Sequence, residues 1–136
     1  MTLVKAAAID HIDLSVGDLP RSIAFYDAVL TALGFRRLPG DETIIWRGSQ
    51  TELAIRAATS PGPSSGYDRY RVGLHHLAFR ADSRDAVDRF HAFLLQKGFE
   101  VLDPPAEYPD YGGGYYAVFF ADPDGMKLEL VHRTWD

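Results

Sequence analysis

Three side chains in this sequence, Glu129 and two histidines upstream of it, have the clearest capacity for chemistry. Apolar and polar residues alternate over 126–130 within the predicted strand 126–131, which is the period of a half-buried strand, so Glu129 faces away from its apolar neighbours. A carboxylate at such a place is either an ordinary solvated residue or a metal ligand, and this segment alone leaves both open. The histidines, His11 and His76, favour the second interpretation because they stand at matching points of two similar halves.

Each half is predicted to hold one helix among short strands. The first half is expected to contain strands at 8–16, 35–38, 43–47 and 52–58, with a helix between the first two that starts after the N-cap Asp18 and ends at Gly34. The second is expected to contain strands at 73–81, 99–102, 115–120 and 126–131, with a helix capped by Asp82 or Ser83 and ended by Gly98.

The order of elements is therefore β-α-β-β-β twice, in repeats of about 8–58 and 73–132 joined by a linker of about 59–72 rich in Pro, Gly and Ser. A tight turn at 122–125, Asp-Pro-Asp-Gly, precedes the last strand. Each unit alone would expose an apolar sheet face, so both are expected to share one core in a single α+β domain spanning 1–136.

Composition narrows the class of protein. The chain has 136 residues, 46% hydrophobic and 24% charged, which is typical of a soluble globular domain. A formal charge of −5 and the lack of Lys/Arg runs argue against nucleic acid or anionic membrane as partners. The sequence has no cysteine and no apolar run of membrane-spanning length, and its N-terminus is not a signal peptide, so a cytoplasmic protein is expected.

Four segments together resemble one known family. They are DHIDLSV with the helix DLPRSIAFYDAVLTALGF after it, HHLAFRA, and the ending FFADPDGMKLELV, and they span about 8–132. The chain is similar in these segments to the vicinal oxygen chelate superfamily, which holds glyoxalases, bleomycin resistance proteins and extradiol dioxygenases. The resemblance implies two βαβββ units that form a curved mixed sheet around a cleft, and commonly a homodimer.

The resemblance also implies a metal site. Family ligands come from the first and last strand of each unit, which here gives His11, His76 and Glu129, with Ala54 at the fourth position. Glu52, two residues earlier, is a weaker candidate for that place. Two imidazoles and one carboxylate suit a divalent Fe, Mn, Ni, Co or Zn ion and leave positions for water and substrate.

Departures from the family pattern leave the reaction open. Extradiol dioxygenases and fosfomycin-resistance transferases carry a tyrosine where this chain has Phe119, and glyoxalase I uses four ligands where Ala54 removes one.

Other polar residues share the expected cleft-facing side. Asp13, Arg80 and Tyr115 are the candidate catalytic residues. Asp13 is either a base or a partner of Arg80, and Arg80 either holds a substrate carboxylate or phosphate or is a surface arginine at a strand end. Tyr115 lies in line with Phe119. His75 is expected on the opposite face of the strand from His76. Three tyrosines, Tyr108, Tyr111 and Tyr116, flank the glycine run 112–114. This segment is either a flexible aromatic flap over the cleft or a plain long hairpin loop.

Three functions of different classes follow. The first is a metal-dependent lyase, isomerase or dioxygenase acting on a small oxygen-bearing substrate that chelates the metal. The second is a metal-free small-molecule binding protein of the bleomycin-resistance type, with Trp46, Tyr115 and Phe119 as aromatic lining. The third is a polar core without either role, in which the three polar side chains only stabilise the fold.

Overall fold

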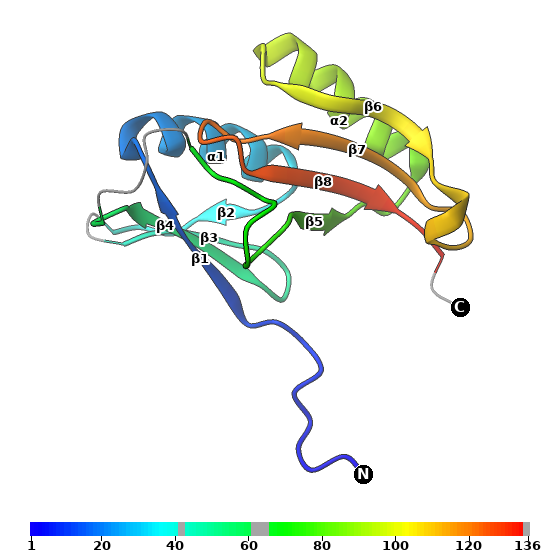
Figure 1. The fold of residues 1–136 in the computed structure, drawn as a ribbon, viewed down its shortest axis with the longest axis horizontal. Helices are drawn as coiled ribbons and strands as arrows, with labels where there is room; N and C mark the ends of the chain where they lie inside the picture. The colour runs from blue at the N-terminus through cyan, green and yellow to red at the C-terminus, as the bar shows by residue number, and fades with distance from the viewer. Residues whose placement is uncertain (41–42, 61–65, 135–136) are drawn as a thin grey trace. The chain divides into compact units, whose positions relative to one another are not determined.

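A computed structural model describes residues 1–40, 43–60 and 66–134. The chain divides into two compact units, Met1–Ser64 and Ser65–Asp136, each with its own sheet and helix (Figure 1). Five residues of the predicted linker, 61–65, lie outside the described ranges. No helix in those ranges is long and apolar enough to pass through a membrane.

The first unit has the predicted βαβββ order. Its elements are β1 (His11–Val16), α1 (Leu19–Ala32), β2 (Arg36–Arg37), β3 (Ile44–Arg47) and β4 (Glu52–Ala57). The sheet order is β1-β4-β3-β2, with β1 parallel to β4 and the other pairs antiparallel. The Asp18 side chain accepts a hydrogen bond from the Arg21 backbone N–H at 3.1 Å, so the predicted N-cap of α1 is confirmed.

Trp46 belongs to the core of this unit and not to an aromatic lining. Its side chain is fully buried, its indole N–H donates to Asp27 Oδ1 of α1 at 2.8 Å, and its ring lies 6.1 Å from that of Tyr26. The prediction that Trp46 lines the cleft is therefore wrong. Buried indoles need a partner for their N–H, and Asp27 on the helix supplies it.

The second unit repeats the topology of the first. Its elements are β5 (Leu77–Arg80), α2 (Arg84–Lys97), β6 (Val101–Glu107), the short 3₁₀ helix η1 (Pro109–Tyr111), β7 (Tyr116–Ala121) and β8 (Lys127–His132). The order is β5-β8-β7-β6, so β8 lies between β5 and β7 (Figure 1). Ser83 caps α2 by accepting from the Ala86 N–H, and Gly98 ends it at φ 73°. The predicted α+β class and double repeat are confirmed.

The two faces of this second sheet differ in character. One face packs on α2, where Val87, Phe90 and Leu94 are buried against strand residues that include Phe120. The opposite face carries a separate apolar cluster of Ala117, Phe119 and Val131, with Leu102, Tyr108 and Tyr115 packed on it. Residues alternate between these faces along each strand, so Glu129 lies on the face away from α2.

Two strands, β5 and β6, differ most from their predicted ranges. β5 begins at Leu77, so His75 and His76 precede the strand. β6 continues to Glu107 through Pro104 and Pro105, with irregular register between Val101 and Ala106. Proline is tolerated there because β6 is the edge strand of its sheet and loses no ladder hydrogen bond on its open side.

Candidate functional site

The predicted turn at 122–125 sets the position of Glu129. Asp122 is buried, and its Oδ1 accepts from the backbone N–H groups of Asp124 and Met126, both at 2.9 Å. Gly125 takes φ +84°, a conformation that favours glycine. The turn fixes Ala121 opposite Lys127, which in turn places Phe119 opposite Glu129 in the ladder.

Glu129 is the only charged side chain of the described residues that is completely buried and stands away from a turn. One oxygen, Oε2, accepts a short hydrogen bond from the Tyr115 hydroxyl. The other, Oε1, lies 3.1 Å from His76 Nε2, within ion-pair distance but not in hydrogen-bonding geometry. Among the described residues Oε1 has no hydrogen-bond partner, which is unusual for a buried carboxylate because its desolvation is costly.

These two residues fit a transition-metal ion. A cation would neutralise the buried charge and occupy the free lone pairs of Oε1. Two ligands bound to one ion at about 2.1 Å lie about 3.0 Å apart in octahedral and about 3.4 Å apart in tetrahedral geometry, and the Nε2–Oε1 separation of 3.1 Å falls in this range. One imidazole and one carboxylate also form the mixed donor set that such ions accept.

Tyr115 is tied to the same carboxylate. Burial first, then its bond to Glu129, raises the pKa of the Tyr115 phenol far above its ordinary value, so the hydroxyl keeps its proton and acts as a donor. The Arg133 guanidinium lies over the Tyr115 ring, 5.4 Å from the centroid. Tyr115, predicted as a candidate catalytic residue, therefore orients Glu129 in this structure.

His75 and His76 are in direct contact. Their Nδ1 atoms are 2.8 Å apart and their rings meet edge to face at 5.1 Å. Desolvation first, then the charges of His76, Lys127 and Arg69, lowers the pKa of His75. The prediction that the two imidazoles lie on opposite faces is wrong, since alternation applies only within a strand and β5 starts after both.

Aromatic rings cover the face next to Glu129. The Tyr108 ring stacks on Tyr111 at 5.5 Å and meets Phe119 edge to face at 5.5 Å, while Phe119 also contacts the His76 ring at 6.2 Å. The predicted third tyrosine of a flap, Tyr116, lies elsewhere. Its hydroxyl donates to Asp88 of α2 at 2.6 Å, so its ring is on the helix side of the sheet and the prediction is wrong for this residue.

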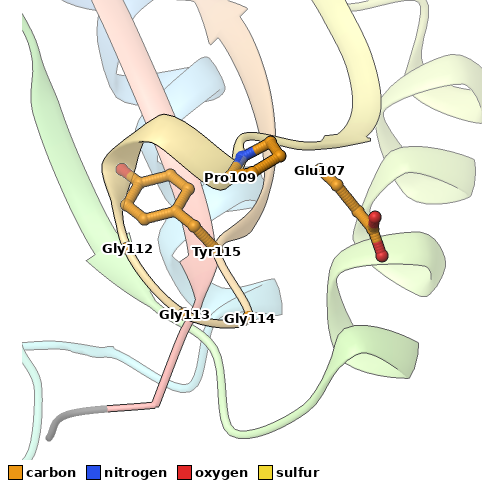
Figure 2. A pocket seen from close by; sticks show the side chains of 6 residues that line it. All are labelled: Glu107, Pro109, Gly112, Gly113, Gly114 and Tyr115. Atoms are coloured by element: carbon orange, nitrogen blue, oxygen red, sulfur yellow. The ribbon is translucent and has the colours of Figure 1, made fainter.

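A hollow of about 320 Å³ opens in the loop beside Tyr115. Its lining residues are Glu107, Pro109, Gly112, Gly113, Gly114 and Tyr115. Figure 2 shows the Tyr115 ring inside the loop, whereas the Glu107 side chain points away from it, in keeping with the Glu107 ion pair to Arg84 of α2 at 2.9 Å. The glycines and one aromatic face thus define the hollow more than any charge does.

In the first unit, register identifies the counterpart of each second-unit residue. Asp13 pairs with Ala54 in the parallel β1–β4 ladder, and Ala78 pairs with Glu129 in the parallel β5–β8 ladder. When His11 is aligned with His76, Asp13 corresponds to Ala78, because each lies two residues later. Ala54 is then the register counterpart of Glu129, in agreement with the sequence prediction.

His11 and Glu52 are register partners at the start of that ladder. The His11 imidazole is 62% exposed and bonds Asp10 at 2.7 Å, and this hydrogen bond is the main reason that the pKa of His11 is raised. Glu52 Oε2 accepts from Arg47 Nε at 2.6 Å. Within the described residues no three His, Cys, Asp or Glu side chains gather as a metal-binding group, and the joining of His11 to His76 and Glu129 stays a prediction.

Asp13 and Arg80 have distinct surroundings. Asp13 receives two hydrogen bonds from the Arg56 guanidinium of β4, which raises the pKa of Arg56. The ion pair of Asp13 is thus with Arg56, a partner that the sequence reasoning missed although Arg56 has the right strand parity. Arg80 pairs with Val131 in the ladder and shares the sheet face of Glu129.

Two βαβββ units with a buried carboxylate on the final strand define an α+β protein of the glyoxalase-like class. Residues 8–130 match the family model of the Glyoxalase/Bleomycin resistance protein/Dioxygenase superfamily. The chain belongs to this family.

Relatives of two kinds are similar over nearly the whole chain. The chain is 42% identical to the uncharacterized protein YqjT of Bacillus subtilis over 123 residues, 89% of this chain and 95% of that protein. It is 33% identical to lactoylglutathione lyase of Salmonella typhimurium, covering 89% of each. A solved glyoxalase/bleomycin resistance protein from Albidiferax ferrireducens has a TM-score of 0.74 at 28% identity, covering 91% of this chain and 98% of that one.

Proposed function

We propose that this protein is a metal-dependent enzyme that acts on a small oxygen-bearing substrate, with His11, His76 and Glu129 as the metal ligands. The observation that carries the proposal is the buried Glu129 carboxylate, whose Oε1 has no hydrogen-bond partner among the described residues and faces His76 Nε2 at 3.1 Å. Family membership supports it independently. A divalent Fe, Mn, Ni, Co or Zn ion bound there would polarise substrate oxygens as a Lewis acid.

The residues around Glu129 have separate roles in this proposal. Tyr115 donates to Oε2 and so directs Oε1 toward His76, as partners of metal ligands commonly do. Phe119 and Tyr108 pack beside His76 and Glu129 and keep water from the carboxylate. A low local dielectric strengthens every charge interaction at the site.

A lyase or isomerase reaction is the favoured chemistry. The Salmonella relative is named as a lyase that acts on lactoylglutathione, and Phe119 leaves this chain without the tyrosine of extradiol dioxygenases. Asp13 and Arg80 are the candidates for proton transfer and for substrate binding. Because Asp13 is held by Arg56, its use as a base would require that ion pair to open.

The alternative is a metal-free binding protein for small molecules. The tyrosine-rich face and the hollow of about 320 Å³ beside Tyr115 favour it. Because Trp46 is buried under α1, the aromatic surface of such a binding protein would consist of Tyr108, Tyr111, Tyr115 and Phe119. A ligand of this protein would be planar and largely apolar, since stacking on such rings needs no charge.

Metal affinity distinguishes the metal-dependent enzyme from the metal-free binding protein. Tag-free protein is stripped with a chelator and titrated with Co²⁺ or Zn²⁺ against a competing dye, for the wild type, His76→Ala and Glu129→Gln, with His91→Ala on α2 as the matched control. The enzyme proposal expects one ion per chain, and a loss of metal affinity of at least tenfold in His76→Ala and Glu129→Gln but not in His91→Ala. Equal affinity in all four proteins would overturn it and favour the binding protein.

Two further features belong to the proposal. Assembly as a homodimer rests on the family resemblance, and residence in the cytoplasm rests on the lack of cysteine in the sequence. Light scattering coupled to size-exclusion chromatography measures the first, and a mass of one chain would contradict it. Fractionation of cells that produce the protein measures the second.

A further inference from the structure

The contact between His75 and His76 has a consequence for which nitrogen of His76 carries a proton. Two imidazole Nδ1 atoms 2.8 Å apart form a hydrogen bond only if one of them bears hydrogen and the other presents a lone pair. Each neutral ring has a single N–H, so the proton in this bond also decides the state of both Nε2 atoms.

The position of His76 Nε2 tells which arrangement suits a cation. This atom lies 3.1 Å from Glu129 Oε1. If His76 carries its proton on Nδ1 and donates to His75, its Nε2 lone pair faces the lone pairs of the buried carboxylate oxygen. Such an assembly of lone pairs is repulsive by itself and favourable around a positive ion.

We propose that His75 is a positioning residue for metal binding: its Nδ1 accepts the Nδ1 proton of His76 and so holds His76 in the tautomer whose Nε2 is a ligand. This inference rests on the proposed function. Histidine ligands usually donate their second N–H to a carboxylate, a carbonyl or water; here the neighbouring imidazole takes that place.

The surroundings of His75 suit the task. Its ring packs edge to face with the His76 ring at 5.1 Å and with the Tyr70 ring at 5.9 Å. Tyr67 anchors the same segment, since its hydroxyl donates to the Leu74 carbonyl. The acceptor nitrogen is thus presented from a segment with its own supports, outside the β5 ladder.

The test uses Zn²⁺, which permits NMR, and the full chain. In histidine-labelled, Zn²⁺-loaded protein, long-range ¹H–¹⁵N correlation is expected to show His76 protonated at Nδ1 and His75 protonated at Nε2.

Two variants separate packing from hydrogen bonding: His75→Phe keeps a ring without an acceptor, whereas His75→Asn keeps an acceptor near the Nδ1 position. Zn²⁺ affinity, measured against a chelating dye, is expected to fall about 10- to 100-fold in His75→Phe and to recover largely in His75→Asn. His91→Phe controls for loss of a distant histidine.

The outcomes separate this inference from the proposed function. If Glu129→Gln and His76→Ala bind Zn²⁺ as the wild type does, the metal site itself is refuted. If those variants lose Zn²⁺ while His75→Phe retains wild-type affinity, or if His76 is protonated at Nε2 in the loaded protein, only the role of His75 is refuted.

Discussion

Replacing Tyr115 by Phe removes a single oxygen atom and leaves the buried Glu129 carboxylate without its hydrogen-bond donor. Because Glu129 is fully buried and its other oxygen has no hydrogen bond, solvent does not replace the lost donor. A hydrogen bond to a charged group contributes about 1.5–3 kcal/mol, and an unsatisfied buried group costs a similar amount. We expect the free energy of unfolding of metal-free Tyr115→Phe to fall by about 2–3 kcal/mol.

Urea denaturation followed by tryptophan fluorescence and by circular dichroism measures this change. Tyr116→Phe is the matched control, because it removes the hydroxyl of the next residue from an exposed bond to Asp88, and a loss below about 1 kcal/mol is expected. The double variant Tyr115→Phe/Glu129→Gln isolates the interaction between the two side chains. Tyr115→Phe is expected to lower the free energy of unfolding less when residue 129 carries a neutral amide than when it carries a carboxylate.

The same substitution is expected to weaken Zn²⁺ binding by about 10- to 100-fold, as the loss of a ligand-orienting partner does. The reasoning is refuted if Tyr115→Phe and Tyr116→Phe lower stability equally and both keep wild-type Zn²⁺ affinity. Equal losses would mean that the carboxylate is satisfied by some group other than Tyr115.

Three other predictions concern the framework. Asp122→Ala removes the acceptor of two backbone N–H groups in the turn, and is expected to lower the free energy of unfolding by about 1–3 kcal/mol by urea denaturation; an unchanged midpoint would contradict the role of the turn. Trp46→Phe leaves Asp27 without the indole donor and is expected to destabilise by a similar amount, while ligand and Zn²⁺ affinity stay at wild-type levels. The pKa of Tyr116 is raised mainly by its bond to Asp88, so the stability from this bond is present below pH about 10 and is lost as pH rises through the higher folded-state pKa. NMR titration of labelled tyrosines should show that pKa falling in Asp88→Asn, and no change would refute the assignment.

Local chemistry was enough to predict the framework. Asp18, Ser83 and Gly98 mark helix ends through their own side chain or backbone preference, and the turn at 122–125 is fixed by residues within it. Glu129 was placed on the correct face because side chains alternate along a strand, and apolar and polar residues alternate over 126–130.

The remaining errors arise where alternation gives no answer. Ile44, Ile45 and Trp46 are all apolar, so the pattern does not tell which face carries Trp46; its helix partner Asp27 does. His75 and His76 lie before β5, where strand parity does not apply.

The full burial of Glu129 could not be predicted from the sequence pattern either. The pattern assigns a face, whereas full burial depends on the hydroxyl of Tyr115 and on aromatic packing from a loop that is distant along the chain.

The central claim is that His11 from one half joins His76 and Glu129 from the other around one cation. Crystals of tag-free protein grown with Co²⁺, with diffraction data collected on both sides of the cobalt absorption edge, test it most directly. We predict one strong anomalous peak per chain within bonding distance of both imidazoles and of Glu129 Oε1. A peak away from Glu129, or His11 far from an ion held by the other two, would contradict the account.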